Sequence, residues 1–322
     1  MQNCQTIHTR ILQKNVPLQT KIKNIGNNLM DSKTQQTFSS QQITPKFISL
    51  ERIIASKNKT LYKLIPKFIL NWFKKLIHLD EINSIIYKYR DKQGVDFANA
   101  VLDELQIRLE VINSQNIPTA GRELVVANHP VGSIDGMALI SVIGQKRKDL
   151  LFPVNDILCQ LPGLKSVFVP INKYGRNSTN HKTLNEAFGG NSIMMFFPAG
   201  TESKIIKGKL QDFAWKKSFV SQAQTFSRDI VPVYIEGRNS KGFYRLYKIR
   251  KFLGIKFDLE MILLPREMFA QRGKTLTLIF GKTISIKQIN KAKYSAKVWA
   301  DKIRSFIYTL KENNNAVFAA DN

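Results

Sequence analysis

Hydrophobic residues recur at steps of three and four between residues 61 and 77, which is the spacing of one face of an α-helix. The residues of this stripe are Leu61, Ile65, Phe68, Ile69, Trp72, Phe73, Leu76 and Ile77. Between Arg52 and Leu79 the chain carries seven basic residues and no acidic one. The pattern predicts one amphipathic helix, which either lies on a membrane surface or packs on a protein core with a solvated lysine face.

After residue 120 the period changes, and short apolar runs alternate with helical patterns. The runs typical of strands are 123–127, 166–170, 192–197, 230–235 and 275–280. The segments typical of helices are 97–109, 137–143, 179–188, 213–225 and 294–310. This alternation predicts an α/β domain with a largely buried sheet, in which a ligand site lies on the loops at the strand ends.

The same patterns divide the chain into four parts. Residues 1–45 are polar and lack a sustained period, so we expect a flexible tail. Residues 46–115 form an N-terminal helical region for membrane docking, residues 116–290 form the α/β domain, and residues 291–322 form a closing helix and tail.

Charge is the unusual feature of the composition. The 322 residues are 43% hydrophobic and 23% charged, as in ordinary globular proteins, but 49 Lys and Arg against 24 Asp and Glu give a net charge of +25. The expected partners are polyanions such as a nucleic acid, an anionic membrane surface or an acidic protein. We expect no nucleic acid, because the chain lacks a zinc-finger, helix-turn-helix or aromatic ribonucleoprotein motif.

Other chemical signals are weak. The two cysteines, Cys4 and Cys159, provide no disulfide framework, which favours a protein that faces the cytoplasm. The four histidines are scattered, so no metal site is expected. No apolar run approaches the roughly 20 residues of a spanning helix, and the N-terminus lacks the apolar core of a secretory signal.

The most informative motif follows the strand-like run 123–127. It reads Asn128-His129-Pro-Val-Gly132-Ser-Ile-Asp135-Gly. A turn at the proline and Gly132 can bring Asp135 back to accept a hydrogen bond from one ring nitrogen of His129. The other nitrogen is then a base for an attacking hydroxyl or amine. Alternatively, His129 is an ordinary loop residue and Asp135 caps the next helix.

Two more loops carry candidate residues. Arg176 follows Gly175 after the run 166–170 and either binds an anion or is a solvated loop arginine. Pro198, Gly200 and Thr201 follow the run 192–197, where exposed backbone amides can bind an anion or polarise a carbonyl, or can form an ordinary turn. A fourth block, Asp229-Ile-Val-Pro232-Val, is a buried strand with a structural role.

In this order and spacing the four blocks resemble the glycerophospholipid acyltransferase superfamily of the lysophosphatidate acyltransferase type. The form Asn-His-Pro-x-Gly-x-x-Asp-Gly is similar to the hemolysin-like branch of bacterial aminolipid synthesis. The resemblance covers about residues 46–290. It implies an acyltransferase-type mixed sheet flanked by helices and preceded by an amphipathic membrane-docking segment, for which the stripe except Ile77 is the candidate.

The resemblance also implies a mechanism. His129 is the general base and Asp135 its orienting partner, and the acceptor attacks an acyl thioester of acyl carrier protein or CoA. No cofactor is needed. Substrate binding is assigned to Asn128, Gly132, Arg176, Pro198, Gly200 and Thr201. The expected acceptor is a lyso-lipid, and the expected location is peripheral, on the anionic cytoplasmic face of the inner membrane.

The chain departs from the family pattern in two places. Five residues separate His129 from Asp135, where the family has four, and Ala199 and Glu202 replace the Glu and Arg of the third block. Glu202 would repel a phosphate, so a lyso-aminolipid is the expected acceptor, acylated on its hydroxyl. The alternatives are formation of the amide of an amino-acid lipid, acylation of lysophosphatidate, and a non-enzymatic lipid- or nucleic-acid-binding protein.

Overall fold

The computed structural model describes residues 47–57, 59–155, 158–171, 178–255 and 258–320. They belong to one compact unit, which comprises residues 44–322. The predicted tail, residues 1–45, lies outside the described residues.

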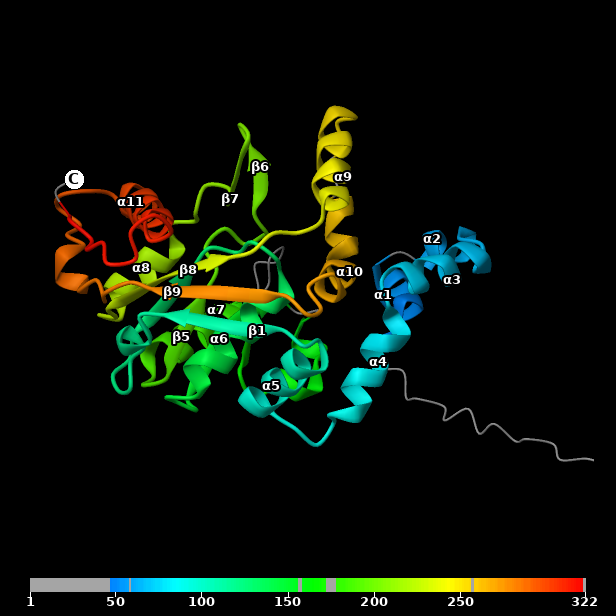
Figure 1. Cartoon of the computed structure of the whole chain (residues 1–322), viewed down its shortest axis with the longest axis horizontal. Coiled ribbons are helices and arrows are strands. Elements are labelled where there is room, and N and C mark those ends of the chain that lie inside the picture. Colours follow the sequence, from blue (N-terminus) through cyan, green and yellow to red (C-terminus); the bar gives the residue numbers. More distant parts are fainter. Residues whose placement is uncertain (1–46, 58, 156–157, 172–177, 256–257, 321–322) are drawn as a thin grey trace, which may run out of the picture. The chain divides into compact units, whose positions relative to one another are not determined.

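A seven-stranded sheet forms the centre of this unit, in the order β1-β9-β8-β2-β5-β3-β4 (Figure 1). Its strands are β1 (Arg108–Ile112), β2 (Leu124–Ala127), β3 (Leu150–Asn155), β4 (Phe168–Ile171), β5 (Ile193–Phe196), β8 (Ile230–Glu236) and β9 (Thr275–Phe280). Neighbouring strands run parallel except for β8 and β9, which are antiparallel. A separate hairpin pairs β6 (Lys204–Ile206) with β7 (Lys209–Gln211). The expected mixed α/β sheet is therefore confirmed.

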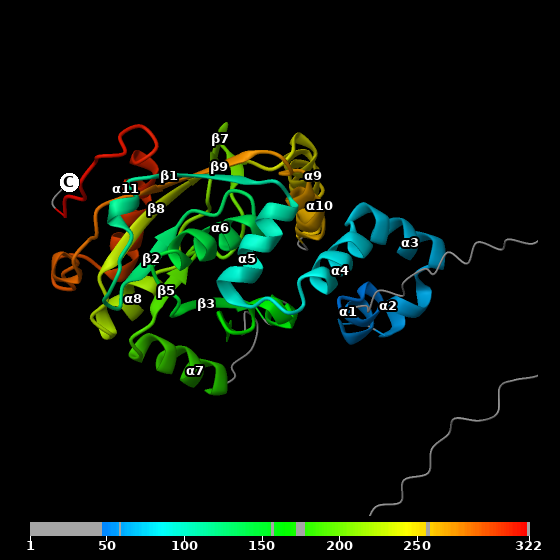
Figure 2. The same cartoon turned by 60° about the horizontal axis from the view of Figure 1, so that its bottom comes forward.

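Helices cover both faces of the sheet. On one face lie α5 (Gly94–Glu104) and α6 (Ser133–Gly144), which pack side by side in Figure 2. On the other face lie α8 (Ser218–Thr225) and α11 (Ala296–Thr309). Strand β2 shows why both faces must be covered. Val125 and Ala127 point to the first layer, whereas Leu124 and Val126 point to the second.

The single helix expected over residues 61–77 is wrong. The chain forms α1 (Leu50–Lys57), α2 (Lys59–Leu64) and α3 (Lys67–Leu76), followed by α4 (Leu79–Lys88). The break lies at Pro66, which has no N–H to donate and disfavours a helical conformation at Ile65. The carbonyl of Pro66 instead accepts from the N–H groups of Ile69 and Leu70 and begins α3.

One expected helix ends earlier than predicted, and several elements were not predicted. The helix expected over residues 97–109 ends at Glu104, and residues 108–112 form β1, which pairs with β9. Strand β3, which contains Pro153, was not among the expected strands. The proline is tolerated because β3 pairs with β5 only at residues 150–151 and with β4 at residues 152–155. Three more helices are α7 (Ser178–Gly189), α9 (Lys241–Phe252) and α10 (Leu264–Phe269). The sequence predicted α7 but neither α9 nor α10.

A buried arginine ties together the loops at the amino-terminal edge of the sheet. The guanidinium of Arg228 donates to carbonyl oxygens of Phe188 at 2.8 Å, Arg122 at 2.7 Å and Ser192 at 2.8 Å. It also donates to Ala187 and Gly190. Burial lowers the pKa of Arg228 to about 10, and these acceptors of its hydrogen bonds are all backbone carbonyl oxygens.

Candidate active site

The site begins where β2 leaves the centre of the sheet, between β8 and β5. The side chain of Asn128 accepts from the backbone N–H of Ile235 at 2.7 Å and donates to its carbonyl at 2.9 Å. This side-chain amide continues the backbone pairing of β2 with β8 for one more residue. It thereby fixes the point and direction at which the next residue, His129, leaves the sheet.

His129 and Asp135 are in direct contact. Nδ1 of His129 lies 2.9 Å from Oδ2 of Asp135, and the same oxygen accepts from the backbone N–H groups of Val131 at 2.8 Å and Gly132 at 3.0 Å. Asp135 is fully buried in the first turn of α6. Three donors therefore hold one carboxylate oxygen. A carboxylate at Nδ1 selects the tautomer that carries its proton there and leaves Nε2 able to accept a proton.

A glycine makes the five-residue spacing compatible with this contact. Gly132 has φ of 111°, a conformation that side-chain-bearing residues rarely adopt. A Cβ at this position would also lie 3.2 Å from Cδ2 of Leu264. The turn at Gly132 thus absorbs the extra residue and still returns Asp135 to the imidazole.

The rest of the imidazole is enclosed by one aromatic ring and one carboxylate. Phe197 stacks on it with ring centroids 4.0 Å apart and planes 12° apart. Oε1 of Glu202 lies 4.0 Å from Nε2, and the His129 side chain is 15% exposed. Burial alone would lower the pKa of His129, but the hydrogen bond and charge of Asp135, with the charges of Glu202 and Asp212, raise it.

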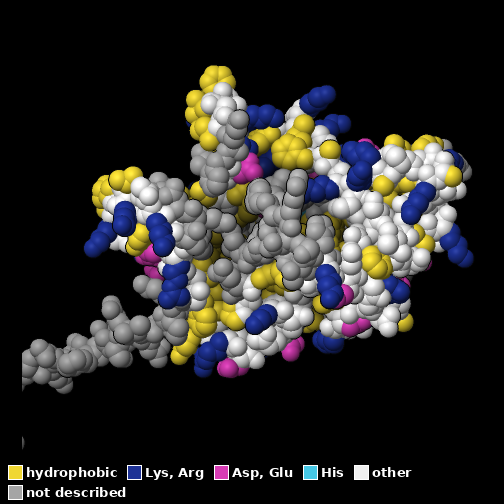
Figure 3. Space-filling view, turned by 180° about the vertical axis from the view of Figure 1, so that it is seen from behind, with side chains coloured by type: hydrophobic (Ala, Val, Ile, Leu, Met, Phe, Trp, Pro, Cys, Tyr) yellow, Lys and Arg dark blue, Asp and Glu magenta, His cyan; other side chains and the backbone are white. Residues whose placement is uncertain are grey.

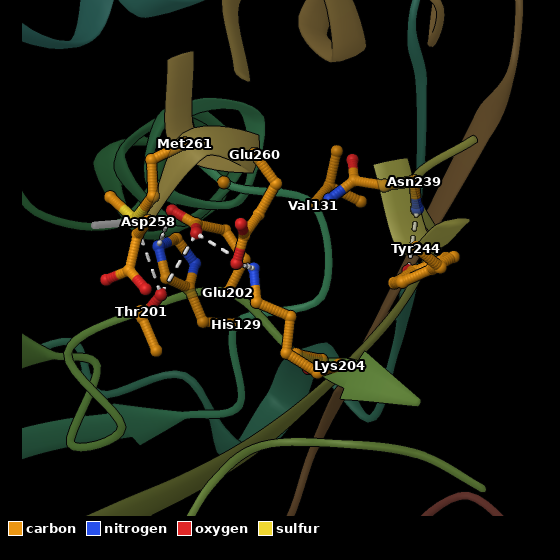
Figure 4. Close-up of polar contacts among 12 residues, drawn as sticks. His129, Val131, Thr201, Glu202, Lys204, Asn239, Tyr244, Asp258, Glu260 and Met261 are labelled. Atoms are coloured by element: carbon orange, nitrogen blue, oxygen red, sulfur yellow. Dashed lines mark hydrogen bonds and ion pairs between the residues drawn. The ribbon is translucent and has the colours of Figure 1, made fainter. Parts of the chain in front are cut away.

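Glu202 belongs to a buried network of charges (Figure 4). Nζ of Lys204 lies 4.0 Å from Glu202 Oε2 and 3.5 Å from Glu260 Oε1, and Arg250 Nε lies 2.8 Å from Glu260 Oε2. Thr201 Oγ1 donates to Glu202 Oε2 at 3.2 Å. Burial lowers the pKa of Lys204, and the charges of Glu202 and Glu260 oppose that shift. The network fixes a carboxylate on the Nε2 side of the imidazole.

A second buried carboxylate, Asp212, holds the backbone under the imidazole. Its Oδ1 accepts from the backbone N–H of His129 at 3.2 Å and from Ser203 Oγ at 2.5 Å, and its Oδ2 accepts from Trp215 Nε1 at 2.9 Å. The N–H of Ser203 donates to the carbonyl of His129 at 2.7 Å. Burial raises the pKa of Asp212, although these donors and the charge of His129 counteract it.

The C-terminal helix secures Asp212 in turn. The backbone N–H of Asp212 donates to the hydroxyl of Tyr308 at 2.8 Å, and Arg304 donates to its carbonyl at 2.6 Å. Both residues belong to α11. The position of His129 therefore depends on a helix that begins more than 160 residues later in the chain.

The structure brings some of the expected substrate-binding residues together. Asn128 and Gly132 flank the His129–Asp135 pair, and Thr201 contacts Glu202 next to Nε2. Pro198 is buried, and its carbonyl accepts from the N–H of Lys216. Gly200, with φ of 67°, turns the chain in the same loop by donating to the carbonyl of Phe197. Arg176 lies outside the described residues.

Sequence reasoning missed the residues that complete the site. Phe197, Lys204, Asp212 and Glu260 were not singled out, and Glu202 was considered only as a departure from a family pattern. Phe197 and Glu202 stand in a noted block, so their place at a strand end was a usable signal. Asp212 and Glu260 carried none, since only the tertiary fold brings them near His129. Across the described ranges, no cluster of three His, Cys, Asp or Glu side chains is arranged to hold a metal ion.

The predicted docking stripe is exposed along part of its length. The side chains of Phe68, Ile69 and Trp72 are 73%, 40% and 59% exposed. The remaining described members, Ile65, Phe73 and Leu76, are half-buried, and the side chain of Leu61 lies outside the described residues. None of the described helices is long and apolar enough to cross a bilayer. Contact of this stripe with a membrane stays a prediction.

Comparison with known proteins adds a family and relatives. Residues 52–317 match the family model described as Acyltransferase. A lyso-glycine lipid O-acyltransferase of Bacteroides thetaiotaomicron is 40% identical over 265 residues, which are 82% of this chain and 97% of the relative. A lyso-glycine lipid O-acyltransferase of Phocaeicola vulgatus is 38% identical over 265 residues, which are 82% of this chain and 95% of that relative. The crystal structure of the 1-acyl-sn-glycerophosphate acyltransferase of Thermotoga maritima aligns with a TM-score of 0.45 and 19% identity, over 81% of this chain and 95% of that one.

Proposed function

Since this chain belongs to the acyltransferase family and is an acyltransferase, we propose that it transfers a fatty acyl group from an acyl thioester to the hydroxyl of a lyso-glycine lipid. The observation that carries the proposal is the His129–Asp135 pair. It leaves Nε2 as a proton acceptor at the carboxyl end of a central strand, where α/β enzymes bind their ligands.

In the proposed reaction the acceptor O–H gives its proton to Nε2 of His129 while the oxygen attacks the thioester carbonyl. Asp135 keeps the Nδ1 proton in place and stabilises the imidazolium that forms. The tetrahedral intermediate then expels the thiol of acyl carrier protein or CoA, which leaves with the proton returned from Nε2. The products are an ester and a free thiol. The thioester already carries an activated carbonyl, so the residues required are a base and its orienting partner.

Two observations favour a lyso-glycine lipid as the acceptor. Both curated relatives act on a lyso-glycine lipid according to their names, and each aligns along nearly its full length. In addition, the buried carboxylate of Glu202 lies 4.0 Å from Nε2, where it would repel the up to two negative charges of an acceptor phosphate more strongly than the single charge of a glycine carboxylate. Lysophosphatidate is therefore the disfavoured acceptor, and ester formation is favoured over amide formation.

We further propose that the enzyme works at the cytoplasmic face of the membrane and docks through α2 and α3. Phe68, Ile69 and Trp72 are exposed apolar side chains, and Lys63, Lys67 and Lys75 on the same two helices are exposed as well. A helix with exposed aromatic residues and lysines suits the boundary between headgroups and acyl chains of an anionic bilayer. Both lipid substrate and product would then stay in the membrane.

The test is an acyl-transfer assay with acyl carrier protein thioester and acyl-CoA as donors. Lyso-glycine lipid, lyso-ornithine lipid and lysophosphatidate are compared as acceptors. We expect ester formation with lyso-glycine lipid, lost in His129→Ala. His78→Asn is the control, because it removes another partly buried histidine whose φ of 54° asparagine tolerates. Full activity in His129→Ala, or an equal rate with lysophosphatidate, would refute the mechanism or the acceptor, respectively.

A further inference from the structure

A second exposed apolar patch lies at the C-terminal end of α9, which extends away from the sheet in Figure 1. Phe252 is 90% exposed and Leu253 is 61% exposed. Ile249 and Ile255 are 47% and 38% exposed. We call these four residues the α9 tip. In Figure 3 hydrophobic side chains gather at the end of this helix, at the top of the view.

The α9 tip is flanked by exposed lysines, whereas Arg250 on the same helix pairs with Asp258 and Glu260. Residues 241–255 include five basic residues and no acidic one. Lys248 and Lys251 are exposed within one turn of Phe252. An apolar patch surrounded by lysines does not suit a purely aqueous surface, because nearly the whole side chain of Phe252 is left in water. It suits a surface with an apolar interior and anionic headgroups.

The other end of α9 is fixed firmly to the core. Phe243, Tyr244 and Tyr247 are buried, and Ser240 caps the helix by accepting from the N–H of Phe243 at 3.2 Å. Nζ of Lys204 lies 4.3 Å from the ring centroid of Phe243, so the root of α9 contacts the charge network beside His129. The 12 residues of α9 extend over about 18 Å. The helix therefore connects the candidate active site rigidly with the exposed tip.

We propose that the α9 tip inserts into the headgroup region of an anionic lipid bilayer and forms a membrane contact separate from the stripe on α2 and α3. Phe252 and Leu253 enter the boundary of the acyl chains, and Lys248 and Lys251 pair with lipid phosphates. Because the root of α9 is fixed beside the charge network next to His129, this contact holds the candidate active site at about the length of α9 from the membrane surface. Binding through the tip requires no catalysis, so its test is independent of the proposed reaction.

The experiment measures flotation of the full chain with vesicles of phosphatidylglycerol and phosphatidylethanolamine in equal parts. The variant Phe252→Ser/Leu253→Ser removes the apolar contact, and Lys248→Gln/Lys251→Gln removes the charge. The matched controls are Val298→Ser/Val317→Ser, at exposed valines elsewhere (40% and 61%), and Lys287→Gln/Lys291→Gln, at exposed lysines elsewhere. All substituted positions are exposed, so we expect every variant to fold, as unchanged circular dichroism would show.

We expect the apolar variant to bind these vesicles about a hundredfold more weakly, because two large apolar side chains no longer leave water. The charge variant should lose about thirtyfold and show a weaker dependence on salt. Both controls should bind like the wild type. Unchanged vesicle binding in the apolar variant would overturn the proposal. If that variant also lost self-association or binding to acyl carrier protein, the tip would instead be a contact surface for a protein.

Discussion

Replacement of Asp135 by asparagine tests the central contact of the site. The substitution keeps the size of the side chain and an oxygen that can accept the N–H groups of Val131 and Gly132, but it removes the negative charge. In the structure Nδ1 of His129 lies 2.9 Å from Oδ2 of Asp135, so the imidazolium of the transition state forms directly beside this carboxylate. Two unit charges at that distance attract by about 6 kcal/mol at an effective dielectric constant of about 20. This energy corresponds to about four orders of magnitude in rate.

We therefore expect Asp135→Asn to lower kcat/KM for acyl transfer about 10⁴-fold, as in catalytic triads that lose their carboxylate. Asp149→Asn is the control, because Asp149 pairs with Arg147 and is about half exposed. Residues that act as a unit are not additive. The double variant Asp135→Asn/His129→Ala should thus be about as slow as His129→Ala alone. A loss below tenfold in a folded Asp135→Asn variant, or a double variant much slower than either single one, would refute the reasoning.

Three other predictions concern the acceptor, pH and stability. Glu202→Gln should raise the rate with lysophosphatidate relative to lyso-glycine lipid about tenfold. The phosphate carries up to one more negative charge than a glycine carboxylate, and at an assumed separation of about 10 Å that charge is repelled by about 1.7 kcal/mol at a dielectric constant of about 20. An unchanged ratio of rates for the two acceptors would contradict this. Despite burial, the hydrogen bond and charge of Asp135 raise the pKa of His129 above its ordinary value of 6.5, so His129 is protonated and cannot act as a base at low pH. The profile of kcat/KM should rise with pH through a midpoint above 6.5 that falls in Asp135→Asn, and a midpoint that does not change in Asp135→Asn would contradict the assignment. Arg228→Met leaves several buried carbonyl groups without donors and should lower the free energy of unfolding by about 3 kcal/mol, measured by urea denaturation, whereas the same change at the exposed Arg245 should have almost no effect.

The parts of the site that the sequence predicted are those encoded locally. His129 and Asp135 lie six positions apart across a proline and a glycine, so a single turn brings them together. The sequence also predicted a turn at Gly132, and the structure gives that glycine a φ of 111°. A chemical pair and its spacing can be recognised before the fold is known when one turn of the backbone determines the geometry.

The parts that could not be predicted depend on distant segments. Glu260 reaches Lys204 only because α9 contacts both β6 and the 3-10 turn Leu259–Leu263. Asp212 reaches His129 only through the hairpin of β6 and β7. Neither carboxylate stands in a recognisable motif. The misassigned end of the helix at residues 97–109 has a related cause. Residues 108–112 form a strand because β9 is available to pair with them, which no local periodicity reveals.

The links of the site to the end of the chain determine when the enzyme can become active during its synthesis. Strand β1 can pair only after β9 has been synthesised. Asp212, which holds the backbone of His129, can be fixed only after Arg304 and Tyr308 have been synthesised. Helices α2 and α3, with their exposed apolar side chains, leave the ribosome more than 200 residues earlier. The growing chain can therefore meet a lipid surface long before it can catalyse a reaction there. By the docking proposed above, an incomplete chain released early would bind membranes without acylating a lipid.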